Sequence, residues 1–123
     1  DILDFADIAN ETTLTYYEGV VASATANDTV MVLTDAAGFA DAEAVEDAII
    51  ANGQNSVVGN DAVIAFFNST LGHAQVIVDD NADNAADAIN LGGTTGVAVV
   101  VDLTGITNTT QLAEAFSSAA FVL

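Results

Sequence analysis

The chain has 123 residues, with 18 Asp and Glu, no Lys or Arg, and one His, which gives a formal net charge of −18. Nucleic-acid binding is excluded because the chain has no Lys or Arg to contact phosphate. Binding to an anionic membrane surface and phosphoryl transfer also depend on Lys or Arg and are excluded for the same reason. The absence of Cys excludes disulfides, thiolate catalysis and Cys-based metal sites. No apolar run is long enough to span a bilayer.

Hydrophobic residues make up 52% of the chain, which predicts a folded core rather than disorder. The length predicts a single domain over residues 1–123. Eighteen carboxylates without cationic partners repel one another, so something outside the chain must neutralise part of the charge. Calcium is the favoured candidate because carboxylate and carbonyl oxygens are its preferred ligands. High external salt, as in halophilic proteins, is the alternative.

The first half of the chain predicts strands before a helix. Residues 12–17 and 20–24 are weakly β-like, whereas residues 29–34 (Thr-Val-Met-Val-Leu-Thr) predict a strong strand. A turn is expected at residues 35–38, which end in Gly38. These residues therefore predict the first strong strand of a sheet.

A helix is predicted to begin after Asp41, which is typical of an N-cap, with Glu43 in the first turn where the helix dipole favours an anion. Asn52 and Gly53 provide a stop signal. The apolar face of this helix is expected to consist of Ala42, Val45, Ala48 and Ile49.

Residues 61–67 are apolar on both faces, which predicts a central strand covered on both sides. Residues 68–72 predict a turn, and residues 73–79 predict the second strand of a hairpin. His73 and Gln75 fall on the polar face of that strand, so we expect it to be half-exposed.

In the last third of the chain, residues 89–91 predict a short strand and residues 96–102 a strong one. Asn108 and Gln111 form a plausible capping pair for a short helix that ends near Phe116. The strand–helix–strand order earlier in the chain predicts a parallel pair, and the hairpin adds an antiparallel strand. The expected fold is α+β, a mixed β-sheet with one or two packed helices.

An acidic turn is the best candidate metal site. Counting from Asp79 as position 1, side-chain oxygens recur at Asn81, Asp83 and Asp87, and Ala85 offers its carbonyl at position 7. Calcium loops of the EF-hand type use this spacing, because alternate residues of a tight turn point their oxygens inward. The turn follows a predicted strand rather than a helix and is therefore calcium-loop-like. A solvated acidic turn is the alternative.

Catalysis has little support in the sequence. His73 is the only candidate base for a nucleophile triad, and the nearest serine, Ser69, lies across the same predicted turn. The motif that places a catalytic serine at a strand-to-helix elbow is not present. We expect an exposed turn histidine and no enzymatic activity.

Short stretches of similarity to a known family occur at residues 1–5, 32–39, 62–76, 79–91 and 121–123. Together they resemble the C-terminal region of calcium-binding RTX-type proteins exported by the type I secretion pathway of Gram-negative bacteria. The opening residues 1–5 are similar to the last edge of a nonapeptide β-roll, and the ending Phe-Val-Leu at residues 121–123 is similar to an uncleaved export signal. The other similar stretches are residues 32–39, 62–67 and 67–76, and the acidic turn with Ile-Asn-Leu at residues 89–91.

The resemblance implies a non-enzymatic, extracellular or cell-surface module that supports type I secretion and folds when calcium binds outside the cell. Its partners would be calcium ions and the type I secretion machinery. The alternative function is a self-assembling subunit of a surface layer or extracellular filament. In that case residues 96–101 or the apolar tail at 121–123 would pair with the exposed strand edge of another copy.

We predict that Asp83→Ala removes one bound calcium per chain, because the central ligand of the turn is lost and Asp79 then faces Asp87 without an ion. The expected loss of stability in saturating calcium is about 2–4 kcal/mol, the linkage for calcium at about 100–1,000 times its dissociation constant. Asp80→Ala, on the opposite side of the strand end, is the matched control. Calorimetric calcium titration of both variants measures the effect, and equal behaviour would reduce the turn to a solvated acidic loop.

Overall fold

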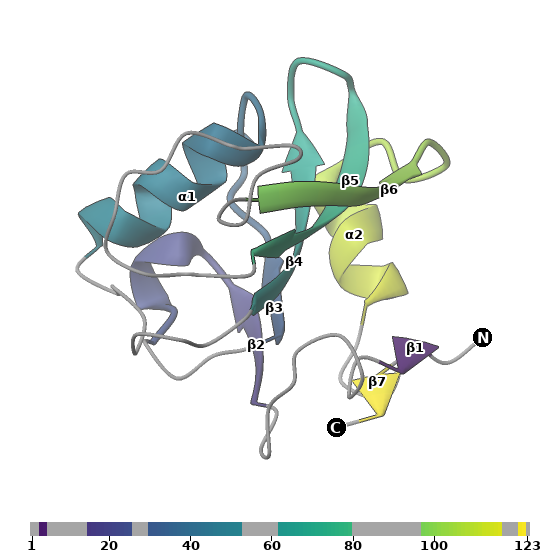
Figure 1. The fold of residues 1–123 in the computed structure, drawn as a ribbon. Helices are drawn as coiled ribbons and strands as arrows, with labels where there is room; N and C mark the ends of the chain where they lie inside the picture. The colour runs from purple at the N-terminus through teal and green to yellow at the C-terminus, as the bar shows by residue number, and fades with distance from the viewer. Residues whose placement is uncertain are drawn as a thin grey trace.

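A five-stranded mixed β-sheet lies at the centre of the protein (Figure 1). The computed structural model describes residues 3–4, 15–25, 30–52, 62–79, 97–116 and 121–122. The sheet order is β2-β3-β4-β5-β6, so strands that follow one another in the chain are also neighbours in space. Its strands are β2 (Tyr16–Gly19), β3 (Val30–Leu33), β4 (Ala62–Asn68), β5 (His73–Asp79) and β6 (Val97–Leu103).

The directions of the strands confirm the predicted mixed sheet. β2, β3 and β4 are parallel, and β5 is antiparallel to both β4 and β6. The strand–helix–strand unit predicted for residues 29–67 is therefore present, followed by the predicted hairpin. Together with two helices, this arrangement is an α+β fold.

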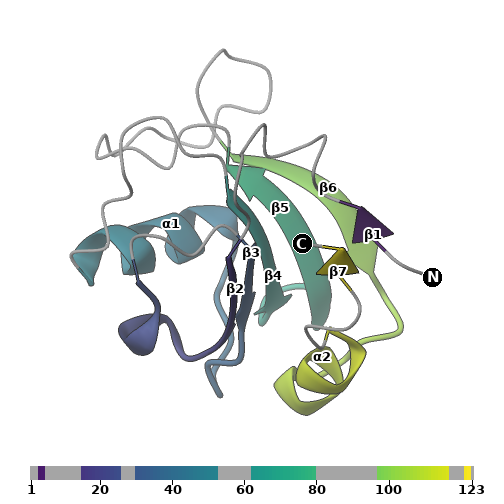
Figure 2. The same cartoon turned by 90° about the horizontal axis from the view of Figure 1, so that it is seen from below.

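One helix lies on each face of the sheet (Figure 2). α1 (Ala42–Ala51) begins at the predicted cap, where the Asp41 Oδ1 atom accepts a hydrogen bond from the Ala44 N–H at 2.9 Å. α2 (Thr109–Ala115) begins after Asn108, whose Oδ1 atom accepts from the Gln111 N–H at 2.9 Å. Neither helix is long and apolar enough, within the described ranges, to cross a membrane.

The core has two apolar layers, one on each side of the sheet, because alternate residues of a strand point to opposite faces. The layer beneath α1 contains Ala24, Met31, Leu33, Phe39, Ala42, Val45, Ile49, Ala62, Ile64, Phe66 and Ile77. The layer beneath α2 contains Val30, Val32, Val63, Ala65, Ala74, Val76, Leu112 and Phe116. β3 and β4 contribute to both layers, as predicted for residues 61–67.

The prediction that β5 is half-exposed is wrong. Ile77 and Gln75 are buried on one face of the strand, and Ala74 and Val76 are buried on the other. The physical reason is that β5 lies between β4 and β6, with an apolar layer on each side of the sheet. A polar residue on such a strand must find a hydrogen-bond partner.

The weak strand predicted for residues 20–24 is also wrong. Those residues form a short 3-10 helix, η1 (Val21–Ser23), between two parallel strands. Of the strand predicted at 12–17, Tyr16 and Tyr17 belong to β2, Thr15 is not in a strand, and residues 12–14 lie outside the described residues. The short strand predicted at residues 89–91 lies outside the described residues.

The two ends of the chain lie side by side (Figure 1). β1 (Leu3–Asp4) and β7 (Phe121–Val122) form a two-stranded parallel sheet. Phe121 and Val122 of the apolar tail, which the sequence offers for pairing with a neighbour, therefore pair with Leu3 and Asp4 of the same chain.

Two turns use glycine in the left-handed region. Gly38, at φ +62°, closes the turn after β3, and its N–H donates to the Asp35 carbonyl at 2.8 Å. Gly72, at φ +74°, closes the β4–β5 turn, and its N–H donates to the Asn68 carbonyl at 2.9 Å. The two sites differ in their surroundings. A Cβ atom at Gly38 would lie 2.5 Å from the Phe67 carbonyl oxygen, whereas a Cβ atom at Gly72 would contact nothing within 4 Å.

We predict that Gly38→Ala lowers the free energy of unfolding by about 3 kcal/mol, through left-handed strain together with the overlap on the β4 backbone. Gly72→Ala, the matched control, should cost about 1 kcal/mol from the strain alone. Thermal or urea unfolding of both variants measures the difference. Equal losses would show that the turn after β3 can move away from β4 without cost.

Candidate functional site

The predicted calcium turn begins at the end of a strand, as expected. Asp79 is the last residue of β5, and it pairs with Ala62 on one side and Val97 on the other. The segment from 80 to 96 therefore leaves and rejoins the sheet at neighbouring points. Asn81, Asp83, Ala85 and Asp87 lie outside the described residues, so calcium binding at this turn stays a prediction.

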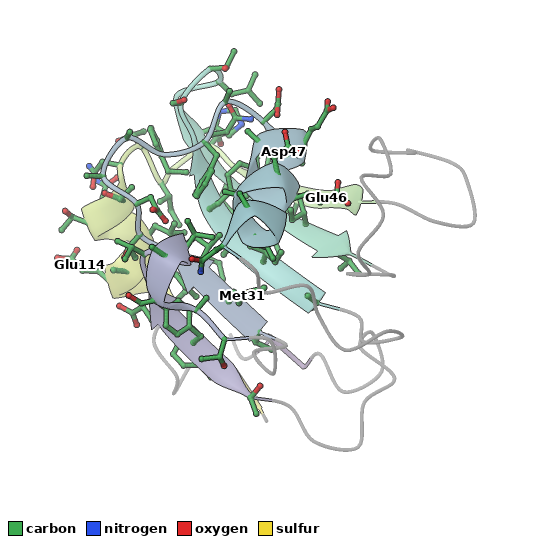
Figure 3. All side chains as sticks on the ribbon, turned by 90° about the vertical axis from the view of Figure 1, so that its left-hand side faces the viewer. Met31, Glu46, Asp47 and Glu114 are labelled. Atoms are coloured by element: carbon green, nitrogen blue, oxygen red, sulfur yellow. The ribbon has the colours of Figure 1, made fainter. Side chains whose placement is uncertain are left out.

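Most carboxylates in the described part of the chain are exposed on the surface, whereas Glu46 of α1 is buried. Asp47 projects from α1 and Glu114 from α2, both exposed, on elements that cover opposite faces of the sheet (Figure 3). Among the described residues no three or more His, Asp or Glu side chains come together as a metal site. The carboxylates of the described residues are therefore spread over several elements and are not gathered at one site.

The most developed polar cluster joins three strands on the α1 side of the sheet. In this cluster, which we call the Gln75 network, the Asn68 Nδ2 atom donates to the Gln75 Oε1 atom at 2.8 Å. The Gln75 Nε2 atom donates to the Asp102 Oδ1 atom at 2.7 Å. The His73 Nε2 atom lies 3.2 Å from the same oxygen. These four residues form a continuous chain from β4 through β5 to β6.

Sheet register places these side chains on one face. Asn68 pairs with His73 across the hairpin, and Gln75 pairs with Asp102 across the next ladder. Gln75 also pairs with Phe66, whose side chain belongs to the α1 layer. Residues paired in this way have their side chains on the same face of a sheet, so the register alone explains the network.

The hydrogen bonds of the network run in one direction, from the Asn68 amide through the Gln75 amide to the Asp102 carboxylate. The Asn68 Oδ1 atom accepts from the N–H groups of Thr70 and Leu71, at 3.0 and 2.9 Å, so its amide must donate through Nδ2. Gln75 then receives at Oε1 and donates at Nε2. Asp102 is therefore required as an acceptor, which the ionised carboxylate provides.

The pKa of Asp102 is lowered from its ordinary value by the hydrogen bond from Gln75 first and by the contact with His73 second. Burial opposes this shift only weakly because the carboxylate lies at the rim of the sheet, with its side chain 53% exposed. The ionised form is the one that the network stabilises. The buried end of the network, at Asn68 and Gln75, is neutral.

His73 is not the exposed turn residue that the sequence suggests, because its side chain is only 19% exposed and contacts Asp102. The nearest serine does not join it. The Ser69 Oγ atom donates to the Phe39 carbonyl at 3.1 Å. In the described ranges His73 is thus paired with a carboxylate but not with a nucleophile.

A second polar contact lies at the other edge of the sheet. The Tyr16 hydroxyl is 2.6 Å from the Phe116 carbonyl oxygen and 2.9 Å from the Glu18 Oε2 atom. Burial raises the pKa of Tyr16, and the hydrogen bond and negative charge of Glu18 raise it further. The phenol therefore stays protonated, and it links β2 to the end of α2.

Sequence reasoning identified Asn68, His73 and Gln75 as turn and strand residues but not as a cluster. The tight turn at residues 68–72 is the sequence signal that could have revealed part of the cluster, because it places Asn68 opposite His73. Asp102 could not be placed because 17 residues, 80–96, separate β5 from β6.

Comparison of the chain with protein-family models, curated proteins and solved structures finds no match. In the described residues the Gln75 network is a fully connected arrangement that binds the β4–β5 turn to β6. A hydrogen-bonded network of this kind, buried at Asn68 and Gln75, stabilises one register of a sheet over others.

Asp102→Asn tests the network through its pH dependence. A carboxylate with a lowered pKa adds stability at pH values above its ordinary pKa of about 3.9, and this contribution disappears as the pH falls through the lowered value. We expect wild type to melt above Asp102→Asn at neutral pH, with the gap closing as the pH falls below the ordinary pKa of an Asp carboxyl.

Asp47→Asn, which removes one exposed charge from α1, controls for the general relief of repulsion. Melting temperatures from circular dichroism between neutral and acidic pH measure all three proteins. A gap for Asp102→Asn that is independent of pH, or that matches the control, would contradict an ionised acceptor at the end of the network.

Proposed function

We propose that the chain is a non-enzymatic, extracellular or cell-surface module that is exported by type I secretion and that folds when calcium is present. The observation that carries the proposal is the imbalance of charge. The chain has 18 Asp and Glu and no Lys or Arg, and His73, which lies 3.2 Å from Asp102, is its only side chain that can become cationic. The native fold therefore concentrates negative charge that its own side chains do not neutralise.

Cations from the medium are the natural source of neutralisation. A cation that binds the native state but not the unfolded chain adds folding free energy that grows with its concentration. In a compartment with little free calcium, repulsion would favour the unfolded chain that export requires. Outside the cell, calcium would shift the balance to the folded module. Sodium would only screen the charges, which is a weaker and less specific effect.

The roles of the polar residues also favour a module without catalysis. The His73 ring faces Asp102, and the Ser69 hydroxyl is bonded to the backbone. Gln75 and Asn68 are buried and bonded to each other. These side chains hold the sheet together, which supports a folding and structural role.

The test is thermal unfolding in calcium chloride, magnesium chloride and sodium chloride at matched ionic strength. We expect millimolar calcium to raise the melting temperature to a plateau that the other two salts do not reach, and a chelator to reverse it. If the melting temperature instead rises gradually up to molar concentrations and equally in all three salts, the protein is stabilised by high salt, as halophilic proteins are, and not by calcium binding. Equal melting under all conditions would contradict the proposal.

A self-assembling structural subunit is the second candidate function, and the position of β6 favours it. β6 lies at an edge of the five-stranded sheet, and residues 97–101 contain no charged residue. Val101 is 42% exposed on this strand. Edge strands with unpaired backbone groups can add a strand from another chain, and Lys or Pro, which commonly block such pairing, are absent from β6.

Val101→Lys should abolish assembly because it places a charge on the edge strand. Leu71→Lys, at the exposed tip of the β4–β5 turn, changes the net charge equally and should leave assembly intact. Light scattering at high protein concentration in calcium measures both variants. Wild type that remains monomeric, or Val101→Lys that assembles like wild type, would contradict a role for β6.

A further inference from the structure

Asn52 occupies a chemically labile position in the fold. It directly follows Ala51, the last residue of α1, and its side chain is exposed. In the sequence it is followed by Gly53, and this is the one Asn-Gly pair in the chain. We propose that Asn52 is a site of spontaneous deamidation and that its conversion to a carboxylate breaks the contact between α1 and η1.

The reaction needs no cofactor or enzyme. The backbone nitrogen of Gly53 attacks the Asn52 side-chain carbonyl carbon, a C–N bond forms, and the Cγ–Nδ2 bond breaks with loss of ammonia. Water then opens the cyclic imide at either carbonyl, which leaves aspartate or isoaspartate. A following glycine favours the attack because it carries no Cβ to obstruct the ring and allows the required backbone angles.

The structure shows what the lost amide does. The Asn52 Nδ2 atom donates to the Val21 carbonyl at 2.9 Å, and this bond joins the end of α1 to the first residue of η1. Val21 is held on its other side by Asp35, whose Oδ2 atom accepts from the Val21 N–H at 2.9 Å. Deamidation would place a carboxylate oxygen where the donor now lies, against the Val21 carbonyl, and the link would become repulsive.

The described residues around Asn52 offer no Lys or Arg side chain that could balance the new charge. The Asn52 N–H donates to the Ala48 carbonyl at 3.1 Å, so the residue lies at the negative end of the helix dipole. The last turn of α1 contains no basic residue, and the whole chain has no Lys or Arg. The product would therefore be less stable than the original chain.

Two other asparagines provide internal controls. Asn68 is followed by Ser69 and is only 3% exposed, with both side-chain atoms bonded. Asn108 is exposed at the start of α2 but is followed by Thr109, and its oxygen accepts from Gln111. Burial in one case and a bulkier following residue in the other should make both react much more slowly than Asn52.

The test is incubation of the folded chain at mildly alkaline pH and 37 °C, followed by mass spectrometry. Trypsin has no cleavage site because the chain lacks Lys and Arg, so chymotryptic peptides or fragmentation of the intact chain must locate the change. We expect a gain of about one dalton at Asn52 before any at Asn68 or Asn108. Gly53→Ala should slow that gain by about tenfold, because the added Cβ hinders the attack.

The structural consequence is tested with Asn52→Asp, which reproduces one product, and Asn52→Gln, which retains an amide. Asn52→Asp and the aged protein should melt about 2–6 °C below fresh wild type. The melting temperature of Asn52→Gln should lie between that of fresh wild type and that of Asn52→Asp. No mass gain at residue 52, or equal gain at all three asparagines, would overturn the site. Normal melting of Asn52→Asp would overturn its effect on the contact between α1 and η1.

Discussion

The lack of Lys and Arg determines how this protein satisfies its polar groups. Where a partner is known, its carboxylates accept hydrogen bonds from N–H and O–H groups instead of pairing with Lys or Arg. Asp41 caps α1, Asp35 holds η1, and Asp102 ends the Gln75 network. Such bonds are local and directional, so the carboxylates fix turns, caps and strand register, while the apolar layers on the two faces of the sheet hold the fold together.

Hydrogen bonds of this kind explain why β5, a buried strand, tolerates Gln75. Burial of the Gln75 amide without hydrogen-bond partners would cost free energy. Here its oxygen accepts from Asn68 and its nitrogen donates to Asp102. The charge of the network lies at the exposed rim and the neutral amides lie inside, so no unpaired charge is buried in this cluster. The β4–β5 turn and the end of β6 are thus linked through uncharged groups.

The fold followed from local signals where those signals were strong. β-branched runs predict β3 and β6, a run that is apolar on both faces predicts β4, and the capping residues Asp41 and Asn108 predict the starts of both helices. The errors arose where tertiary packing decides. Gln75 looked exposed because alternation cannot show that a second strand and a second layer cover β5. Its partner Asp102 lies 27 residues further along the chain, and a long connection leaves the β5–β6 register undetermined by the sequence.

The buried position of Asn68 has a consequence for how the protein can be made. Residues 68–70 read Asn-Ser-Thr, which is an acceptor sequence for N-linked glycosylation. The enzyme attaches the sugar to Nδ2, the atom that donates to Gln75 in the fold. A glycan added to the nascent chain would therefore be incompatible with the β4–β5 hairpin as it stands. Glycosylation at Asn68 in a eukaryotic secretory host would therefore remove the hydrogen bond between Asn68 and Gln75 and place a glycan in the interior of the sheet.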